Sequence, residues 1–199
     1  MIFKVENIAK SFGNKNVLKE ISFELKPGSL SGIVGENGSG KSTLLRIIVG
    51  EWKADNGTIS FDGKLGYCPQ SIQLFSQLSV LENFLYFSTA YGIGKEELQD
   101  SSNQLMNHFN FLKYSKEKVA NISGGTKQKL NLSIALIHQP DLLILDEPYN
   151  GFDWDTYLKF WEYTEILKQK GCAILVVTHF LNEKTKFDHI YTLEKGYLI

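Results

Sequence analysis

Three short runs along the chain are apolar at almost every position. They are Leu30–Val34 (LSGIV), Leu142–Leu145 (LLIL) and Cys172–Val177 (CAILVV). Short apolar runs without polar alternation are typical of strands that are buried on both faces, as in a parallel sheet. The sequence therefore predicts a mostly parallel core sheet, to which Leu65–Pro69 (LGYCP) adds another short strand.

Elsewhere apolar and polar residues alternate, which is typical of half-exposed antiparallel strands. This pattern occurs at Ile2–Glu6, Ile21–Leu25 and Thr58–Asp62, and Asn14 and Asn16 bracket a turn. A terminal hairpin is predicted over Asp188–Ile199, with its turn at Lys195-Gly196.

Helical spacing, with apolar residues three or four positions apart, predicts helices at Ser42–Val49, Val80–Tyr91, Leu98–Leu112, Lys127–Ile137 and Asp155–Lys168. We interpret the region from Gln70 to about Asn121 as a helical lobe. We expect Pro140 to end the later helix at Lys127–Ile137. Most of the aromatic residues at the start of this lobe are expected in its core, with some left for a partner surface: Phe75, Phe84, Tyr86, Phe87 and Tyr91.

These elements predict one α/β domain over residues 1–199. Residues 1–70 would form an antiparallel β subdomain and the start of the core, residues 71–138 an inserted α-helical subdomain, and residues 139–199 the rest of the core.

Composition narrows the functional classes. The net charge of -1 offers no basic field for nucleic acid. No apolar run approaches the ~20 residues that cross a bilayer, and the N-terminus lacks the apolar core of a signal peptide, so we expect a cytosolic protein. Cys68 and Cys172 lie in apolar segments without C-x-x-C spacing and are expected to be buried thiols.

The segment Gly35 to Ser42 (GENGSGKS) fits G-x-x-x-x-G-K-[ST] and lies between a predicted strand and a predicted helix. Glycines let successive N–H groups turn toward a phosphate, where the helix N-terminus adds partial positive charge. Lys41 would reach the β- and γ-phosphates, and the Ser42 hydroxyl would ligate Mg²⁺. A glycine-rich turn that fits by chance is disfavoured because both flanks also fit.

The three apolar runs end at the glycine loop, at the Asp146-Glu147 pair and at His179. The carboxyl ends of parallel strands meet at one edge of a sheet, where ligands bind, so we expect the three to share a site. A solvated turn for the acidic pair and a structural role for the histidine are the alternatives.

Phosphoryl-transfer chemistry suggests a role for each group at this edge. Asp146 would help to hold Mg²⁺, and Glu147 would orient and deprotonate the attacking water. Gln70 would contact the metal or that water, and His179 would hydrogen-bond the γ-phosphate. Further along, Ser123, Gly124 and Gly125 precede a helix and form either a second anion site or a simple cap.

Together these residues resemble the nucleotide-binding subunits of ATP-binding cassette (ABC) transporters over essentially the whole chain. GENGSGKS resembles the Walker A loop, Gln70 the Q-loop, ISGGTKQK the signature motif, LLILDEP the Walker B strand with its catalytic Glu147, and His179 the switch histidine. Asp153 lies at the D-loop position, although the run Asn150–Asp153 differs from the usual Ser-Ala-Leu-Asp.

The resemblance implies a P-loop NTPase core with ATP and Mg²⁺ as cofactors. The residues implied in ATP binding are Phe12, Val17, Gly35, Glu36, Asn37, Gly38, Ser39, Gly40, Lys41, Ser42 and Thr43. Phe12 would stack on adenine and Val17 would pack on the same base, although either residue could instead serve simple sheet packing.

Ser123, Gly124 and Gly125 would bind the ATP held by a second ABC ATPase subunit, identical or different, in a head-to-tail dimer. Thr126 stands where the family usually has Gln. By the same resemblance the chain is peripheral on the inner face of the membrane through a separate transporter subunit.

The leading interpretation is an ATPase subunit of an ABC transporter, resembling the short cassettes of exporters. The competing class is a soluble ABC-type ATPase that acts on DNA or ribosomes, whose members carry coiled coils or tandem cassettes. A nucleotide-binding regulator without hydrolysis is disfavoured because Glu147 and His179 are both present.

Overall fold

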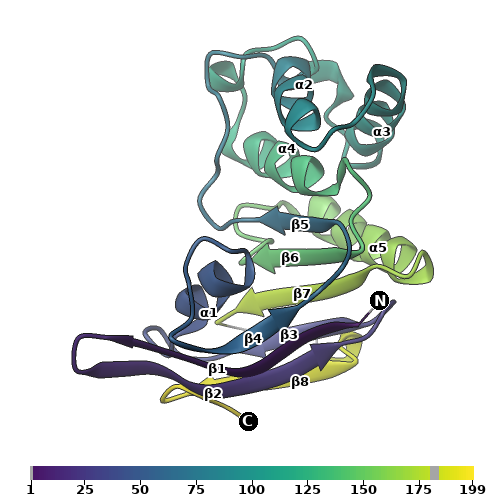
Figure 1. The fold of residues 1–199 in the computed structure, drawn as a ribbon. Coiled ribbons are helices and arrows are strands. Elements are labelled where there is room, and N and C mark those ends of the chain that lie inside the picture. Colours follow the sequence, from purple (N-terminus) through teal and green to yellow (C-terminus); the bar gives the residue numbers. More distant parts are fainter. Residues whose placement is uncertain (1, 180–183) are drawn as a thin grey trace.

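The computed structural model describes residues 2–179 and 184–199, and within them it contains an antiparallel sheet, a mostly parallel sheet and a helical lobe (Figure 1). In Figure 1 β1 and β2 of the antiparallel sheet lie low in the view, at the level of β8, while β5, β6 and β7 cross the middle and the lobe stands above the edge strand β5. The expected α/β class is confirmed.

The antiparallel sheet has the strand order β2-β1-β4. Its strands are β1 (Phe3–Phe12), β2 (Lys15–Leu25) and β4 (Asn56–Ser60). The first two are longer than the alternation predicted. Beyond Val5 their register shifts repeatedly, so that strict alternation of buried and exposed residues is lost although the strands still pair.

The second sheet has the strand order β5-β6-β7-β3-β8-β9. Its strands are β3 (Leu30–Val34), β5 (Leu65–Cys68), β6 (Leu142–Asp146), β7 (Ala173–Thr178), β8 (His189–Glu194) and β9 (Tyr197–Leu198). All pairs are parallel except the hairpin β8–β9, which confirms both the predicted parallel sheet and the terminal hairpin.

Both faces of the central strands are covered, which explains their apolar runs. Leu142 and Ile144 pack into a core shared with α1 and the antiparallel sheet, while Leu143 and Leu145 pack into a core shared with the helices. Since neither face meets water, polar alternation would bury unpaired polar groups.

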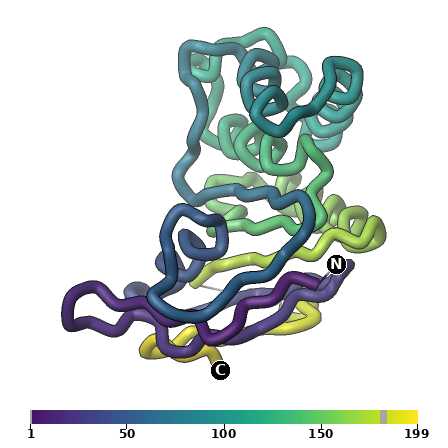
Figure 2. Tube along the Cα trace, viewed as in Figure 1, coloured from purple at the N-terminus to yellow at the C-terminus, as the bar shows by residue number. Residues whose placement is uncertain are grey.

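The five predicted helices are present, with ends that differ by a few residues: α1 (Lys41–Ile48), α2 (Val80–Ala90), α3 (Lys95–His108), α4 (Gly124–Leu136) and α5 (Trp154–Gln169). Short 3-10 helices occur at Leu112–Tyr114, Val119–Asn121 and Lys184–Lys186. Figure 2 follows the chain as it rises from β5 into the lobe on one side and returns from α4 to β6 on the other. None of the helices in the described ranges is long and apolar enough to cross a bilayer.

The lobe departs from its prediction in one place and follows it in another. Residues 70–79 form a loop rather than a helix, because α2 starts only at the capping box formed by Ser79 and Glu82. At the other end α4 stops at Leu136, one residue before its predicted end and ahead of Pro140, as expected.

The expectation that most of the aromatic residues pack in the lobe's core is wrong. Phe84 is buried and Phe87 partly so, whereas Phe75, Tyr86 and Tyr91 are exposed. Phe75 is held at the surface because the buried Asn83 side chain bonds both its N–H (2.9 Å) and its C=O (3.1 Å).

Candidate nucleotide-binding site

The glycine loop connects β3 to α1 at the carboxyl edge of the parallel sheet. Gly38 (φ +82°) and Gly40 (φ +114°) have left-handed backbone angles that strain other residues. A Cβ on Gly35 would collide with the backbone carbonyl of Leu193 in β8. The spacing of these glycines is therefore required by the turn and by the neighbouring strand.

Lys41 folds back over this loop. Its Nζ donates hydrogen bonds to the carbonyl oxygens of Gly35 (2.6 Å) and Glu36 (3.0 Å). Burial lowers the pKa of Lys41, and the nearby charges of Glu147 and Asp146 oppose that shift. The ammonium group thus lies between the loop and the acidic pair.

The acidic pair lies where β6 ends. Asp146 is the last residue of the strand, and Glu147 has a left-handed backbone (φ 49°). Burial, followed by the charge of Glu147, raises the pKa of Asp146 to about 6, although Lys41 acts in the opposite direction. The buried carboxylate of Glu147 and the half-buried carboxyl of Asp146 next to Lys41 leave negative charge that a cation could balance.

The neighbouring strand β7 holds the Glu147 carboxylate. Oε2 accepts a hydrogen bond from Thr178 Oγ1 (2.8 Å), and Oε1 accepts one from the backbone N–H of His179 (2.8 Å). His179 Nδ1 lies 2.7 Å from Oε1. Thr178 was missed by the sequence reasoning, although it is the polar residue that ends an apolar strand.

One cavity of about 520 Å³ brings most of the predicted residues together. It is lined by Phe12, Lys15, Val17, Asn37, Gly38, Gly40, Lys41, Ser42, Thr43, Gln70, Asp146, Glu147 and His179. An adjoining cavity of about 580 Å³ on the other side of the loop is lined by Gly35, Glu36, Ser39 and again His179, among others. Either volume accommodates a nucleotide-sized ligand.

Comparison with known proteins agrees with this geometry. The family model described as ABC transporter matches residues 18–150. An uncharacterized ABC transporter ATP-binding protein of Methanocaldococcus jannaschii is 36% identical over 194 residues, which are 97% of this chain and 74% of that protein. The chain belongs to the ABC transporter ATP-binding family.

Two further matches add detail to the family assignment. The Nod factor export ATP-binding protein I of Sinorhizobium fredii is 34% identical and covers 97% of this chain, which spans 60% of that relative. The dimeric structure of a bacterial ABC transporter cassette superposes with a TM-score of 0.88 at 26% identity, covering 100% of this chain and 96% of its own. The chain is thus a nucleotide-binding ABC cassette and an ATPase coupled to transport.

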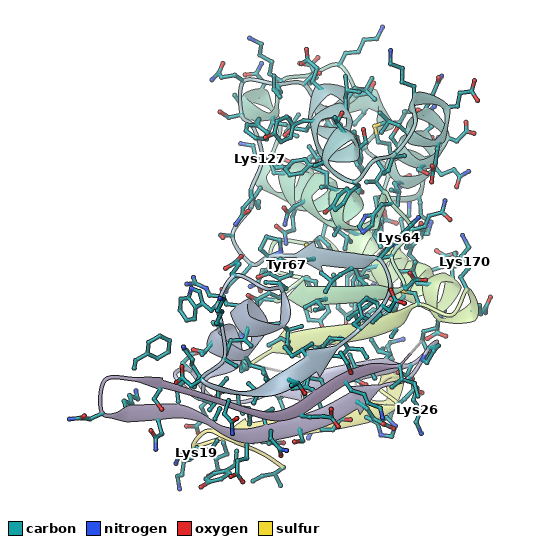
Figure 3. The ribbon with its side chains drawn as sticks, in the orientation of Figure 1. Lys19, Lys26, Lys64, Tyr67, Lys127 and Lys170 are labelled. Atoms are coloured by element: carbon teal, nitrogen blue, oxygen red, sulfur yellow. The ribbon has the colours of Figure 1, made fainter. Side chains whose placement is uncertain are left out.

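The signature residues of this cassette lie apart from the nucleotide cavity. Ser123 caps α4, where its Oγ accepts a hydrogen bond from the backbone N–H of Thr126 (3.2 Å), and Gly124 and Gly125 form the first helical positions. Within the described residues they line neither cavity beside the glycine loop. Figure 3 shows Lys127, two residues after Gly125 in α4, in the lobe and Tyr67 on the core sheet.

Asp153 of the cassette caps α5. Its Oδ1 accepts a hydrogen bond from the backbone N–H of Thr156 (2.8 Å), and hydrogen bonds from Thr156 lower the pKa of the Asp153 carboxyl. The preceding segment touches α4, because a Cβ on Gly125 would lie 3.2 Å from the carbonyl oxygen of Gly151. The signature and D-loop segments are therefore neighbours.

Phe12, at the mouth of the cavity, is 45% exposed. Trp52 packs against Phe12 edge to face, with ring centroids 5.4 Å apart. The Arg46 guanidinium lies over the Trp52 ring, with its Cζ 4.6 Å from the ring centroid. No sequence pattern pointed to Trp52, because it follows α1 in a segment without periodicity. The exposed ring of Phe12 is available for stacking on a base.

Proposed function

We propose that the chain is the ATP-hydrolysing subunit of an export transporter. Two such subunits would assemble head to tail around two ATP molecules and drive a separate membrane-spanning subunit. The observation that carries this proposal is Gly124, a glycine that neither its backbone angle nor any neighbour among the described residues requires.

Glycine has a lower helix propensity than any residue except proline. At Gly124 a Cβ would meet nothing within 4 Å, and the backbone does not have the left-handed angle that favours glycine. Close approach by another molecule explains a bare backbone at this position. The Ser123 hydroxyl and the free N–H groups at the start of α4 fit a phosphate of a nucleotide held by the other subunit.

The cavity residues suit MgATP. We assign the base to Phe12 and Val17 and the phosphates to Lys41 and the loop amides. Ser42, Gln70 and Asp146 would hold Mg²⁺, which would offset the phosphate charge, and the raised pKa of Asp146 supports this cation site.

In hydrolysis, Glu147 would accept the proton of the attacking water, and His179 would orient Glu147 and bond the terminal phosphate. Asp153 would act at the shared interface of the dimer.

The helical lobe carries the surface that we assign to the membrane-spanning partner. Along α2 and in the loop before it, the large exposed apolar side chains are Ile72, Phe75, Leu81, Leu85 and Tyr86. Phe75 and Tyr86 pack together with centroids 4.3 Å apart, and a groove of about 520 Å³ lies between Leu78 and Ala90. Clustered exposed apolar side chains mark interaction sites. This surface follows Gln70 directly, so docking there would couple the partner to the nucleotide cavity.

Export is supported by the name of the Nod factor export relative. The alternative, a soluble ABC-type ATPase acting on DNA or ribosomes, has no comparable support. Under this proposal the chain works at the inner face of the membrane and binds no nucleic acid.

The rate of ATP hydrolysis per chain, measured across protein concentrations, tests the shared site. If each site needs two chains, the rate per chain rises with concentration until dimers dominate. The Gly124→Asp chain should keep the low hydrolysis rate of the monomer at every concentration, because the added carboxylate repels phosphate. The monomer itself has room for the new side chain, since a Cβ at this position meets nothing within 4 Å. A rate per chain that is independent of concentration and unaffected by Gly124→Asp would rule out the shared site.

A further inference from the structure

Thr126 makes two contacts to a single atom, the Ser123 hydroxyl oxygen. The backbone N–H of Thr126 donates to Ser123 Oγ (3.2 Å), and Thr126 Oγ1 lies 2.9 Å from the same oxygen. The first contact is an ordinary helix cap, which any residue at position 126 except proline would provide. The second depends on the threonine hydroxyl.

Burial decides which hydroxyl donates in this pair. Thr126 is only 7% exposed, whereas Ser123 is exposed. Buried polar hydrogens find a partner within the protein. Among the described residues, Ser123 Oγ is the partner that the structure gives to Thr126 Oγ1. Thr126 therefore donates its proton to Ser123, whose own proton can be directed elsewhere.

This arrangement fixes what Ser123 can bind. A hydroxyl has one proton and two acceptor lone pairs. Thr126 occupies both lone pairs, one through its N–H and one through its hydroxyl. The free capacity of Ser123 is then a single outward donor, which suits a ligand with acceptor atoms only, such as a phosphoryl oxygen.

We propose that Thr126 is a positioning residue that presents the Ser123 hydroxyl as a hydrogen-bond donor to the terminal phosphate of ATP on the other subunit. This inference rests on the proposed head-to-tail dimer. A residue that served only helix capping would affect stability but not the affinity for ATP.

The test uses Glu147→Gln chains, in which hydrolysis is slowed and ATP-bound dimers accumulate. The ATP concentration that gives half-maximal dimer is measured by light scattering after size-exclusion chromatography. In this background Thr126→Val replaces the hydroxyl with a methyl group, and Thr126→Ser keeps the hydroxyl. Ser123→Ala is made alone and in combination with Thr126→Val. Thr126→Ala is a second hydroxyl-free variant, and thermal unfolding of each monomer reports its fold.

We expect Thr126→Val and Thr126→Ala to raise the required ATP concentration by about threefold to tenfold, the usual effect of one hydrogen bond. Thr126→Ser should remain within about twofold of its parent. In the Ser123→Ala background, Thr126→Val should have no further effect, because the hydroxyl it orients is absent.

Two results would overturn the proposal: equal ATP requirements for Thr126→Val and Thr126→Ser, or effects of Ser123→Ala and Thr126→Val that multiply. A parent Glu147→Gln chain that stays monomeric at saturating ATP would instead refute the dimer itself, so the two failures are distinguishable.

Discussion

At the residue scale, the carboxyl edge of the sheet concentrates negative charge where little solvent reaches it. Asp146 and Glu147 are adjacent, and Glu147 is only 7% exposed. Lys41 faces both, but its ammonium protons are also engaged by loop carbonyls. In the chain without nucleotide this edge is destabilised electrostatically, and it is prepared for a cation and for phosphate.

Asp146→Asn should therefore stabilise the nucleotide-free chain at neutral pH. The pKa of Asp146 is raised from 3.8 to about 6 in the folded state, so the unfolded chain ionises first as pH rises. Ionisation of Asp146 therefore lowers the free energy of unfolding as the pH rises from about 4 to about 6, and the loss persists at higher pH. Urea unfolding at pH 7.5 should show a gain on the order of 2 kcal/mol for the asparagine variant, which vanishes near pH 4.

Exposed Asp100 on α3 provides the matched control, since Asp100→Asn removes a carboxylate far from this cluster. If Asp146→Asn lowers stability at pH 7.5, or changes it no more than Asp100→Asn does, the electrostatic description of this edge is incorrect.

At the element scale, α5 starts from the D-loop residue, so one side chain combines two tasks. Asp153 caps the helix through Thr156, and it also lies two residues after Gly151, which touches the signature helix. A stability measurement alone cannot separate capping from a role in hydrolysis.

Asparagine separates them, because Asn caps helices as well as Asp does. We expect Asp153→Ala to lower the free energy of unfolding by about 1 kcal/mol and Asp153→Asn to leave it nearly unchanged. If Asp153 acts at the shared site, Asp153→Asn should nevertheless reduce ATP hydrolysis. If the Asp153→Asn chain has both the stability and the ATP hydrolysis rate of the wild type, Asp153 serves only to cap α5.

The elements also show where sequence reasoning succeeds. The buried strands β3, β6 and β7 match their apolar runs within one residue at each end, because two covered faces leave no room for polar residues. The full length of β1 and β2 was underestimated, since their outer halves bury few residues beyond Ile8 and Leu18 and the shifting register leaves no periodic signal there. Phe75 was misplaced because the contact that fixes its loop, through Asn83, is a tertiary hydrogen bond.

At the scale of the whole molecule, the two sets of groups that we assign to phosphate binding occupy one chain without meeting. The glycine loop, the acidic pair and His179 share a cavity, as predicted from the ends of three strands. Ser123, Gly124 and Gly125 were predicted by motif, but their distance from this cavity follows from the placement of the lobe, which no local pattern encodes. Lys15, Trp52 and Thr178 were missed for the same reason: their roles arise only from tertiary contacts.

The central claim is that a second chain completes each nucleotide site, with the cavity of one chain facing Ser123, Gly124 and Gly125 of the other. It is tested most directly by the mass of the Glu147→Gln chain in light scattering, with MgATP and with MgADP. The account predicts about twice the 22.6 kDa of one chain with ATP, one chain with ADP, and one chain with ATP when Gly124→Asp is added. A Glu147→Gln chain that binds ATP yet retains the mass of one chain would contradict it.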